Sequence, residues 1–193
     1  ADTVFVASGV GNSGLAALNL ALPAYSFING AGLMLGMGGA TRCAVLRGEG
    51  RDAAADGVFT MTLAMGAALG CLLTLIGIFF TPALAGLLGA EGETLSLSVR
   101  YLRTILLFSC AFIVNNILVC FIRNDGSPQL SMAAMLAGSF SNIVLDYSFI
   151  FPMGLGMFGA ALATGLAPVF SMLVLSLHFI RRRNHFRLTA CTP

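Results

Sequence analysis

Charged residues are absent from long stretches of this 193-residue chain. No Asp, Glu, Lys or Arg lies between Asp2 and Arg42, none lies in residues 57–90, and residues 126–180 hold only Asp146. Charged side chains make up 9% of the sequence and hydrophobic ones 58%, whereas soluble domains carry about 25% charged residues. A soluble domain of this size could not bury that much apolar surface, and the composition also excludes intrinsic disorder. We therefore expect an integral membrane protein.

Five apolar segments are long enough to cross a bilayer as helices, because about 20 residues span the hydrocarbon core. They lie near residues 15–37, 57–80, 97–122, 130–151 and 157–180. The roughly ten-residue alternating segments of a membrane β-barrel are absent. The sequence thus predicts an all-α, polytopic bundle formed by residues 1–193, with Pro128 opening a helix and a short interfacial piece at 83–88.

The placement of arginines predicts how the bundle is oriented, because basic residues stay on the cytoplasmic side. Arginines gather at 42–51, at Arg123 and at 181–187, and this places residues 7–13 outside and the C-terminus in the cytoplasm. Arg100 and Arg103 depart from the pattern, and they lie either at the interface or in a wet cavity. Residues 4–6 are typical of the end of a further helix, so we expect a fragment truncated within its first span.

Cysteines, histidines and glycines give no sign of a catalytic or metal centre. The five cysteines form no C-x-x-C pair and are expected to be packing residues. His178 and His185 flank arginines, which is more typical of interfacial side chains than of metal ligands. The glycine-rich stretch 30–39 lacks the motif of a phosphate loop. Gly32 and Gly36 instead favour close helix packing in lipid, with a hinge as the alternative.

Asp146 is the one acidic residue deep inside a predicted helix. An aspartate at mid-membrane costs about 2.5–3.5 kcal/mol on insertion scales, so such residues usually have a partner or a function. Asn142 lies one turn earlier on the same helix face. Oxygen-rich groups with a negative charge suit Na⁺ or a bound proton. The alternative is that Asp146 only hydrogen-bonds Asn142, a neighbouring helix and water.

Other polar or helix-bending residues accompany Asp146 within the apolar segments. Pro23 and Pro168 each remove a backbone donor and can kink a helix. Such kinks suit alternating access, although a static bend is the alternative. The remaining polar candidates are Asp2, Asn115, Asn116 and Thr164.

Several motifs occur in order along the chain and carry a family resemblance. They are GLAALNLALP at 14–23, GMGGA at 36–40, RNDGSP at 123–128, NIVLDY at 142–147 and GAALAT at 159–164. The sequence resembles the MATE (multidrug and toxic compound extrusion) transporters, and within them the bacterial DinF/MepA-like branch. That family has twelve helices in two lobes. The chain resembles the N-terminal lobe from the end of helix 1 through helix 6, with the C-terminal lobe absent.

The resemblance implies an antiporter of a bacterial cytoplasmic (inner) membrane that exchanges Na⁺ or H⁺ for organic, often cationic, drugs. Its cation site uses an acid late in helix 1, an asparagine in helix 4, an Asn-x-x-x-Asp pair in helix 5 and a threonine in helix 6. The matching residues here are Asp2, Asn116 (with Asn115 as the alternative), Asn142 with Asp146, and Thr164. The implied partners are the lipid bilayer, small organic substrates and the missing lobe. No nucleic acid and no cofactor beyond the coupling ion is expected.

Two other functions remain as alternatives. A flippase for lipid-linked oligosaccharides, from a related superfamily, would need a more cationic cleft than Arg100 and Arg103 offer. A membrane-embedded enzyme would need a paired nucleophile and base, two catalytic aspartates or a metal cluster. One deep acid without a deep histidine does not supply that chemistry.

Overall fold

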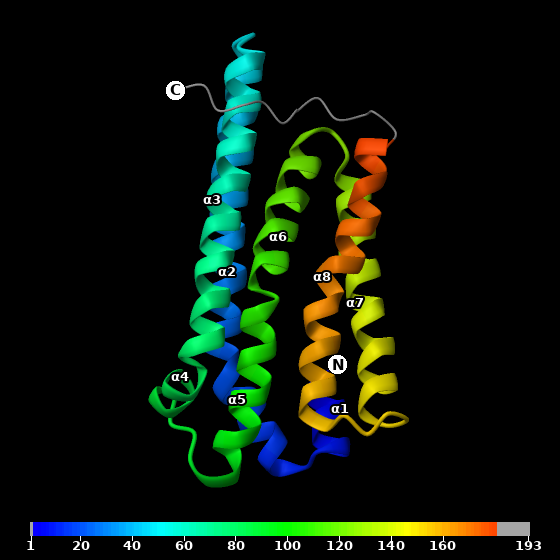
Figure 1. Ribbon diagram of the computed structural model, residues 1–193. Coiled ribbons are helices and arrows are strands. Elements are labelled where there is room, and N and C mark those ends of the chain that lie inside the picture. The colour runs from blue at the N-terminus through cyan, green and yellow to red at the C-terminus, as the bar shows by residue number, and fades with distance from the viewer. Residues whose placement is uncertain (1, 181–193) are drawn as a thin grey trace.

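The computed structural model describes residues 2–180, which form eight helices and contain no strand (Figure 1). The predicted all-α fold is therefore confirmed for this part of the chain, and the predictions for residues 181–193 lie outside it. The helices are α1 (Asp2–Gly9), α2 (Asn12–Gly48), α3 (Asp52–Phe79), α4 (Thr81–Leu87), α5 (Gly92–Leu107), α6 (Ser109–Asn124), α7 (Pro128–Ile150) and α8 (Gly156–Ile180). By length and composition, α2, α3, α7 and α8 can cross a membrane, and the bent pair α5–α6 is also long and apolar enough when its two helices are taken together as one broken span.

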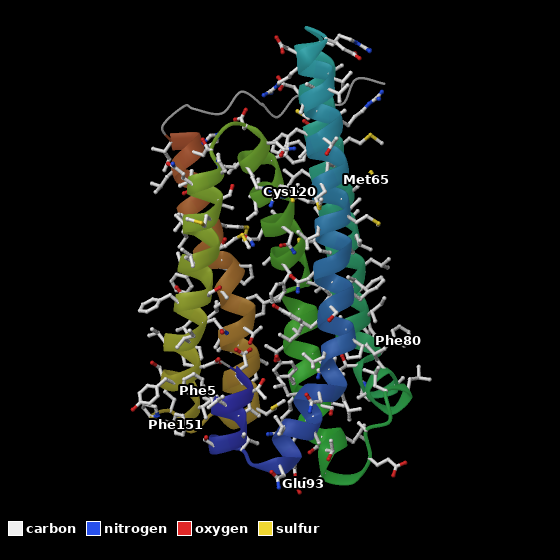
Figure 2. The ribbon with its side chains drawn as sticks, turned by 180° about the vertical axis from the view of Figure 1, so that it is seen from behind. Phe5, Met65, Phe80, Glu93, Cys120 and Phe151 are labelled. Atoms are coloured by element: carbon white, nitrogen blue, oxygen red, sulfur yellow. The ribbon has the colours of Figure 1, made fainter. Side chains whose placement is uncertain are left out.

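Two long helical hairpins flank a central bent helix (Figure 1). The helices α2 and α3 form one hairpin, α7 and α8 form the other, and α6 lies between them in contact with all four. The short α1 packs against α2, α7 and α8. Its Phe5 ring lies edge-on to Phe151 just after α7, with ring centroids 6.3 Å apart (Figure 2). This contact fixes the start of the described chain beside the second hairpin.

The outer surface of the bundle is apolar. Met65 on α3 is 49% exposed and Phe80, just after α3, is 61% exposed, and both side chains project outward (Figure 2). Large exposed apolar side chains also lie along α2, α7 and α8. A surface of this kind is unfavourable in water but matches the hydrocarbon core of a bilayer.

The first hairpin extends further than its apolar residues predict. Helix α2 was expected at 15–37 but runs from Asn12 to Gly48, and α3 begins at Asp52 rather than near residue 57. The arginine-rich stretch at 42–51, which lies between two of the predicted spans, is therefore mostly helical. Arginine, leucine and alanine are all good helix formers, so a helix does not have to end where its membrane-compatible part ends.

The predicted helix at 97–122 is divided at Phe108 into α5 and α6, which meet at 48°. Side chains of α3 and α6 form hydrogen bonds at this break. Thr74 Oγ1 on α3 donates to the Leu106 carbonyl at 3.1 Å, and Ser109 Oγ donates to the Gly70 carbonyl at 2.9 Å. Polar groups inserted beside a helix ladder are a known cause of such kinks.

Small residues on α2 and a short turn after α6 position the central helix α6. A Cβ on Gly36 would lie 3.0 Å from Ile117 Cα, and one on Gly32 would lie 3.1 Å from Ile113 Cα, which confirms close packing of α2 on α6. In the turn after α6, Gly126 has a φ of 77°, a region that favours glycine. Pro128 opens α7 as expected, and α4 corresponds to the predicted interfacial piece.

Candidate cation site

The candidate site begins with the close approach of α7 to α8. Gly138 on α7 faces the Ala167 carbonyl of α8, and a Cβ on Gly138 would lie only 3.0 Å from that oxygen. Asn142 and Asp146 follow Gly138 by one and two turns on the same helix face. The small residue thus allows the polar face of α7 to lie against α8.

Thr164 connects three helices through its side-chain hydroxyl. Its Oγ1 lies 2.8 Å from Oδ2 of Asp2 on α1 and 2.9 Å from the Ala160 carbonyl, so one proton serves two acceptors. Asn142 Nδ2 on α7 donates to the same Oγ1 at 3.5 Å. Asp2, Asn142 and Thr164 therefore come together from α1, α7 and α8.

Asp146 is fully buried beside this group, with 0% of its surface exposed. Neither of its carboxylate oxygens has a hydrogen-bond donor among the described residues, and Asn142, one turn earlier on α7, connects through Thr164 to the carboxylate of Asp2. An isolated buried carboxylate is costly, and two neighbouring acids disfavour a double negative charge. The Asp146 carboxylate, with the oxygens of Asp2, Asn142 and Thr164 nearby, is therefore suited to hold a proton or a small cation.

Two cavities open onto Asp2 and Thr164, and Asp146 lines neither of them. The larger has a volume of about 310 Å³ and the smaller about 150 Å³, which is room for a cation with water. The larger is lined by Asp2, Tyr25, Phe112, Ser139, Asn142, Ile143, Thr164 and Ala167. Both contain Asp2 and Thr164, so these two residues can meet an ion or water arriving from either space.

The prolines differ in their relation to the site. Pro168 lies inside α8 and lacks a backbone N–H, so the carbonyl of Thr164, four residues earlier, loses its usual helical donor. Thr164 can therefore offer a carbonyl oxygen as well as its hydroxyl. Pro23 lies inside α2 with its side chain exposed, and the structure gives it no contact with these polar groups.

The asparagines of α6 lie in a neighbouring cavity of about 240 Å³, which shares Tyr25, Phe112, Ser139 and Ala167 with the larger one. Asn116 Nδ2 donates to Asn29 Oδ1 at 3.1 Å. Asn115 Oδ1 is buried without a hydrogen-bond partner among the described residues. The structure thus groups Asp2, Asn142, Asp146 and Thr164, and it places Asn115 and Asn116 beside that group.

Tyr101 is a residue of this region that sequence reasoning missed. It is 4% exposed and lines the smaller cavity together with Asp2 and Thr164. The available signal was a single tyrosine in the predicted third helix, next to Arg100. Arg100 and Arg103 themselves are exposed, and Arg103 donates to the Ile78 carbonyl at 3.3 Å. The exposure of both arginines, together with this contact of Arg103, favours their interfacial interpretation.

The sequence and the fold are both similar to those of known transporters. The multidrug export protein MepA of Staphylococcus saprophyticus is 36% identical over 170 residues, and MepA of Staphylococcus aureus is 34% identical over the same length. A solved structure described as the inward-facing conformation of a multidrug resistance MATE family transporter of the MOP superfamily has a TM-score of 0.89. It is 33% identical and matches 97% of this chain and 43% of that one.

The sequence similarity extends over most of this chain but only part of each relative. The MepA alignments cover 88% of this chain but only 38% of each relative, so the chain spans well under half of their length. The sequence profile of the MatE family matches residues 1–148, which include the helices of the first hairpin, α6 and most of α7. The chain therefore belongs to the MatE family.

Proposed function

We propose that this chain forms the N-terminal lobe of a transporter that exports organic, often cationic, compounds in exchange for Na⁺ or H⁺. The names of its MepA relatives, multidrug export proteins, support export as the activity. The partial coverage of those relatives supports a second lobe as the partner. In this proposal the substrate binds between the lobes, as in transporters built from paired repeats.

The observation that carries the proposal is the state of Asp146. Its carboxylate is completely buried within α7, and it has no hydrogen-bond donor among residues 2–180. Charged side chains inside a membrane are expensive, and they usually mark ion or proton pathways. Asp2, Asn142 and Thr164 would supply the further oxygens that a hard monovalent cation needs.

Such a group can drive transport because its occupancy changes the local charge. With a proton or Na⁺ bound, the two neighbouring acids carry less negative charge, and the helices that hold them can pack together. When the ion leaves, repulsion between Asp2 and Asp146 and the need for water favour a different arrangement. One elementary charge moving through 100 mV supplies about 2.3 kcal/mol, which is enough to bias such an equilibrium.

The orientation is part of the same proposal. Residues 7–13 lie outside and the arginine-rich ends lie in the cytoplasm of a bacterial cell, so the Asp2 end of the bundle faces outward. The cation enters from that side, where both cavities that contain Asp2 lie. Export of a cationic compound in exchange for an incoming cation then requires the two to bind the protein in alternation.

The direct test measures ion-driven efflux of a fluorescent cationic dye from proteoliposomes that contain the complete transporter. Asp146→Asn keeps the size of the side chain but removes its charge, and it is expected to abolish efflux driven by a Na⁺ or pH gradient. Glu93→Gln neutralises an exposed acid on α5 and serves as the matched control, with efflux retained. Undiminished efflux in folded Asp146→Asn protein contradicts the proposal.

A further inference from the structure

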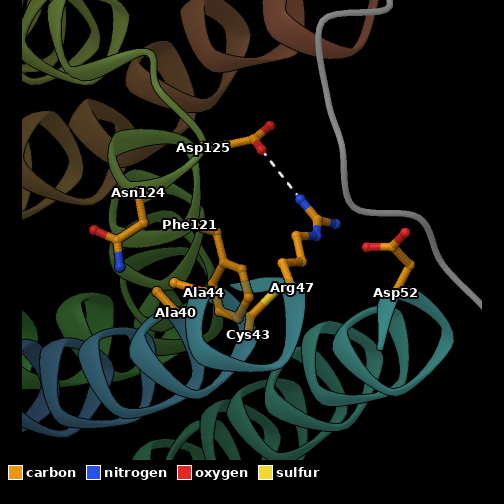
Figure 3. Close-up of a pocket in the computed structure, with 8 residues that line it drawn as sticks. All are labelled: Ala40, Cys43, Ala44, Arg47, Asp52, Phe121, Asn124 and Asp125. Atoms are coloured by element: carbon orange, nitrogen blue, oxygen red, sulfur yellow. Dashed lines mark hydrogen bonds and ion pairs between the residues drawn. The ribbon is translucent and has the colours of Figure 1, made fainter. Parts of the chain in front are cut away.

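Four charged or titratable side chains form a connected cluster at the end of the bundle away from Asp2. They come from four segments and are Arg47 on α2, Asp56 on α3, Asp125 in the turn before α7, and His178 on α8. Arg47 donates to Asp125 and to Asp56 at 3.2 Å each, and His178 Nε2 lies 2.9 Å from Asp125 Oδ2. Figure 3 shows the Arg47–Asp125 pair beside a cavity of about 460 Å³. We call these four residues the clasp.

The clasp is more buried than an ordinary surface ion pair. The side chains of His178 and Asp125 are 1% and 5% exposed, and those of Asp56 and Arg47 are 16% and 20% exposed. The nearby pair Arg51–Glu49 is longer, at 3.6 Å, and its side chains are 62% and 54% exposed. Exposed ion pairs contribute little to stability, whereas removing one partner of a buried pair leaves an uncompensated charge. The clasp therefore holds its four segments together far more firmly than Arg51–Glu49 could.

The clasp and the cation site act on the same two helices. Asp125 lies just before α7, which carries Asn142 and Asp146, and His178 belongs to α8, which carries Thr164. The α7–α8 pair is thus joined at one level by Asp125–His178 and at another by Asn142–Thr164. About 21 Å of helix, at 1.5 Å per residue, separates Thr164 from His178. Pro168 lies within that interval and is a point at which α8 can bend.

We propose that the clasp and the cation site are energetically coupled through α7 and α8. A closed clasp holds the two helices at the spacing that lets Asn142, Asp146 and Thr164 converge on one cation. Opening the clasp weakens cation binding, and cation binding in turn tightens the clasp, because coupling between two sites is reciprocal. Asp125 and His178 are then positioning residues that act on the cation through the helices. This inference rests on the proposed function.

The test compares cation affinity in clasp variants of the complete transporter. The probe is Na⁺ added at constant ionic strength or, where protons saturate Asp146 instead, a pH titration of its carboxyl group. Asp125→Asn and His178→Gln are each expected to weaken binding about fivefold or more, the lower range of coupling between sites. The double variant is expected to be no weaker than Asp125→Asn alone, because both changes break the same contact. Glu49→Gln, which breaks the exposed pair with Arg51, is the control and is expected to match the wild type.

A second measurement needs no change in the clasp and so remains informative if the variants fail to fold. Spin labels replace the exposed side chains of Val45 on α2 and Leu177 on α8, in a background whose native cysteines are substituted. Distances between the labels are measured with and without the cation. Coupling predicts a narrower distribution when the cation is bound.

Different results would overturn the coupling and the proposed function. Wild-type affinity in folded clasp variants, or identical distance distributions with and without a bound cation, overturns the coupling and leaves the cation site standing. Absence of any saturable binding that depends on Asp146 in the wild type overturns the proposed function itself.

Discussion

The hydroxyl Oγ1 of Thr164 on α8 lies 2.8 Å from the carboxylate Oδ2 of Asp2 on α1, although 162 positions separate the two residues in the sequence. The same hydroxyl accepts a hydrogen bond from Asn142 on α7. A single side chain thus connects α1, α7 and α8. The Thr164 hydroxyl can also donate its proton to the Ala160 carbonyl. It can therefore stop donating to Asp2 when a cation binds the Asp2 carboxylate.

Removing this hydroxyl tests its part in the site. Thr164→Ala is expected to weaken cation binding about tenfold or more, since hydrogen bonds to charged groups contribute roughly 1.5–3 kcal/mol. Thr164→Ser keeps the hydroxyl and is expected to stay close to wild-type affinity. Titration of the purified transporter with Na⁺ or protons measures both. Equal losses in the two variants would mean that the methyl group, and not the hydroxyl, matters.

Gly138 tests whether the spacing of α7 and α8 sets the geometry of the site. Gly138→Val places side-chain atoms against the Ala167 carbonyl, which a bare Cβ already approaches to 3.0 Å. Overpacking of this kind costs about 1–3 kcal/mol, and it is expected to lower both thermal stability and cation affinity. Gly38→Val on α2 is the control, because a Cβ there meets nothing within 4 Å. An effect of equal size at Gly38 would argue against a specific role for the α7–α8 spacing.

Pro168 is expected to matter for transport more than for stability. Pro168→Ala restores an N–H that can donate to the Thr164 carbonyl, which stiffens α8 and occupies an oxygen near the cation. Melting temperature should therefore hold or rise while the transport rate falls. Pro23→Ala on α2 provides the comparison. Transport at the wild-type rate in Pro168→Ala would identify the proline as a static bend.

The asparagines of α6 and α7 are expected to behave differently. Asn142 bonds Thr164 directly, whereas Asn116 bonds Asn29 in the neighbouring cavity. Asn142→Leu is therefore expected to weaken cation binding more strongly than Asn116→Leu. Affinities of both variants, measured side by side, decide the order. A larger loss from Asn116→Leu would place that residue among the direct ligands.

Much of the fold follows from local features of the sequence. Charge-free stretches of sufficient length predict helices. Proline is favoured at the first position of a helix, and this preference predicts the start of α7 at Pro128. The break at Phe108 has no such signal, because no proline or glycine lies there. It coincides with hydrogen bonds to Thr74 and Gly70, more than 30 positions earlier in the chain, which only the tertiary structure brings into reach.

In the candidate site, too, some features are predictable from local sequence and others depend on the tertiary structure. The four-residue spacing of Asn142 and Asp146 is enough to predict a shared helix face. The approach of Asp2 to Thr164 was expected only through family resemblance, since nothing local links the two ends of the chain. Asp125 lies in the RNDGSP stretch, whose residue types favour a turn, and its burial against Arg47 and His178 depends on how three helices end at one place. Contacts of this kind leave no periodic signal in the sequence.

Asp146 is the group proposed to take up and release the coupling ion. Infrared difference spectroscopy of the complete transporter follows its carboxyl group directly as Na⁺ is added or the pH is raised. We expect the C=O band of a protonated carboxyl to disappear in the wild type and to be missing from the difference spectrum of Asp146→Asn. The same band change in both proteins would contradict the account, because the ion would then be handled elsewhere.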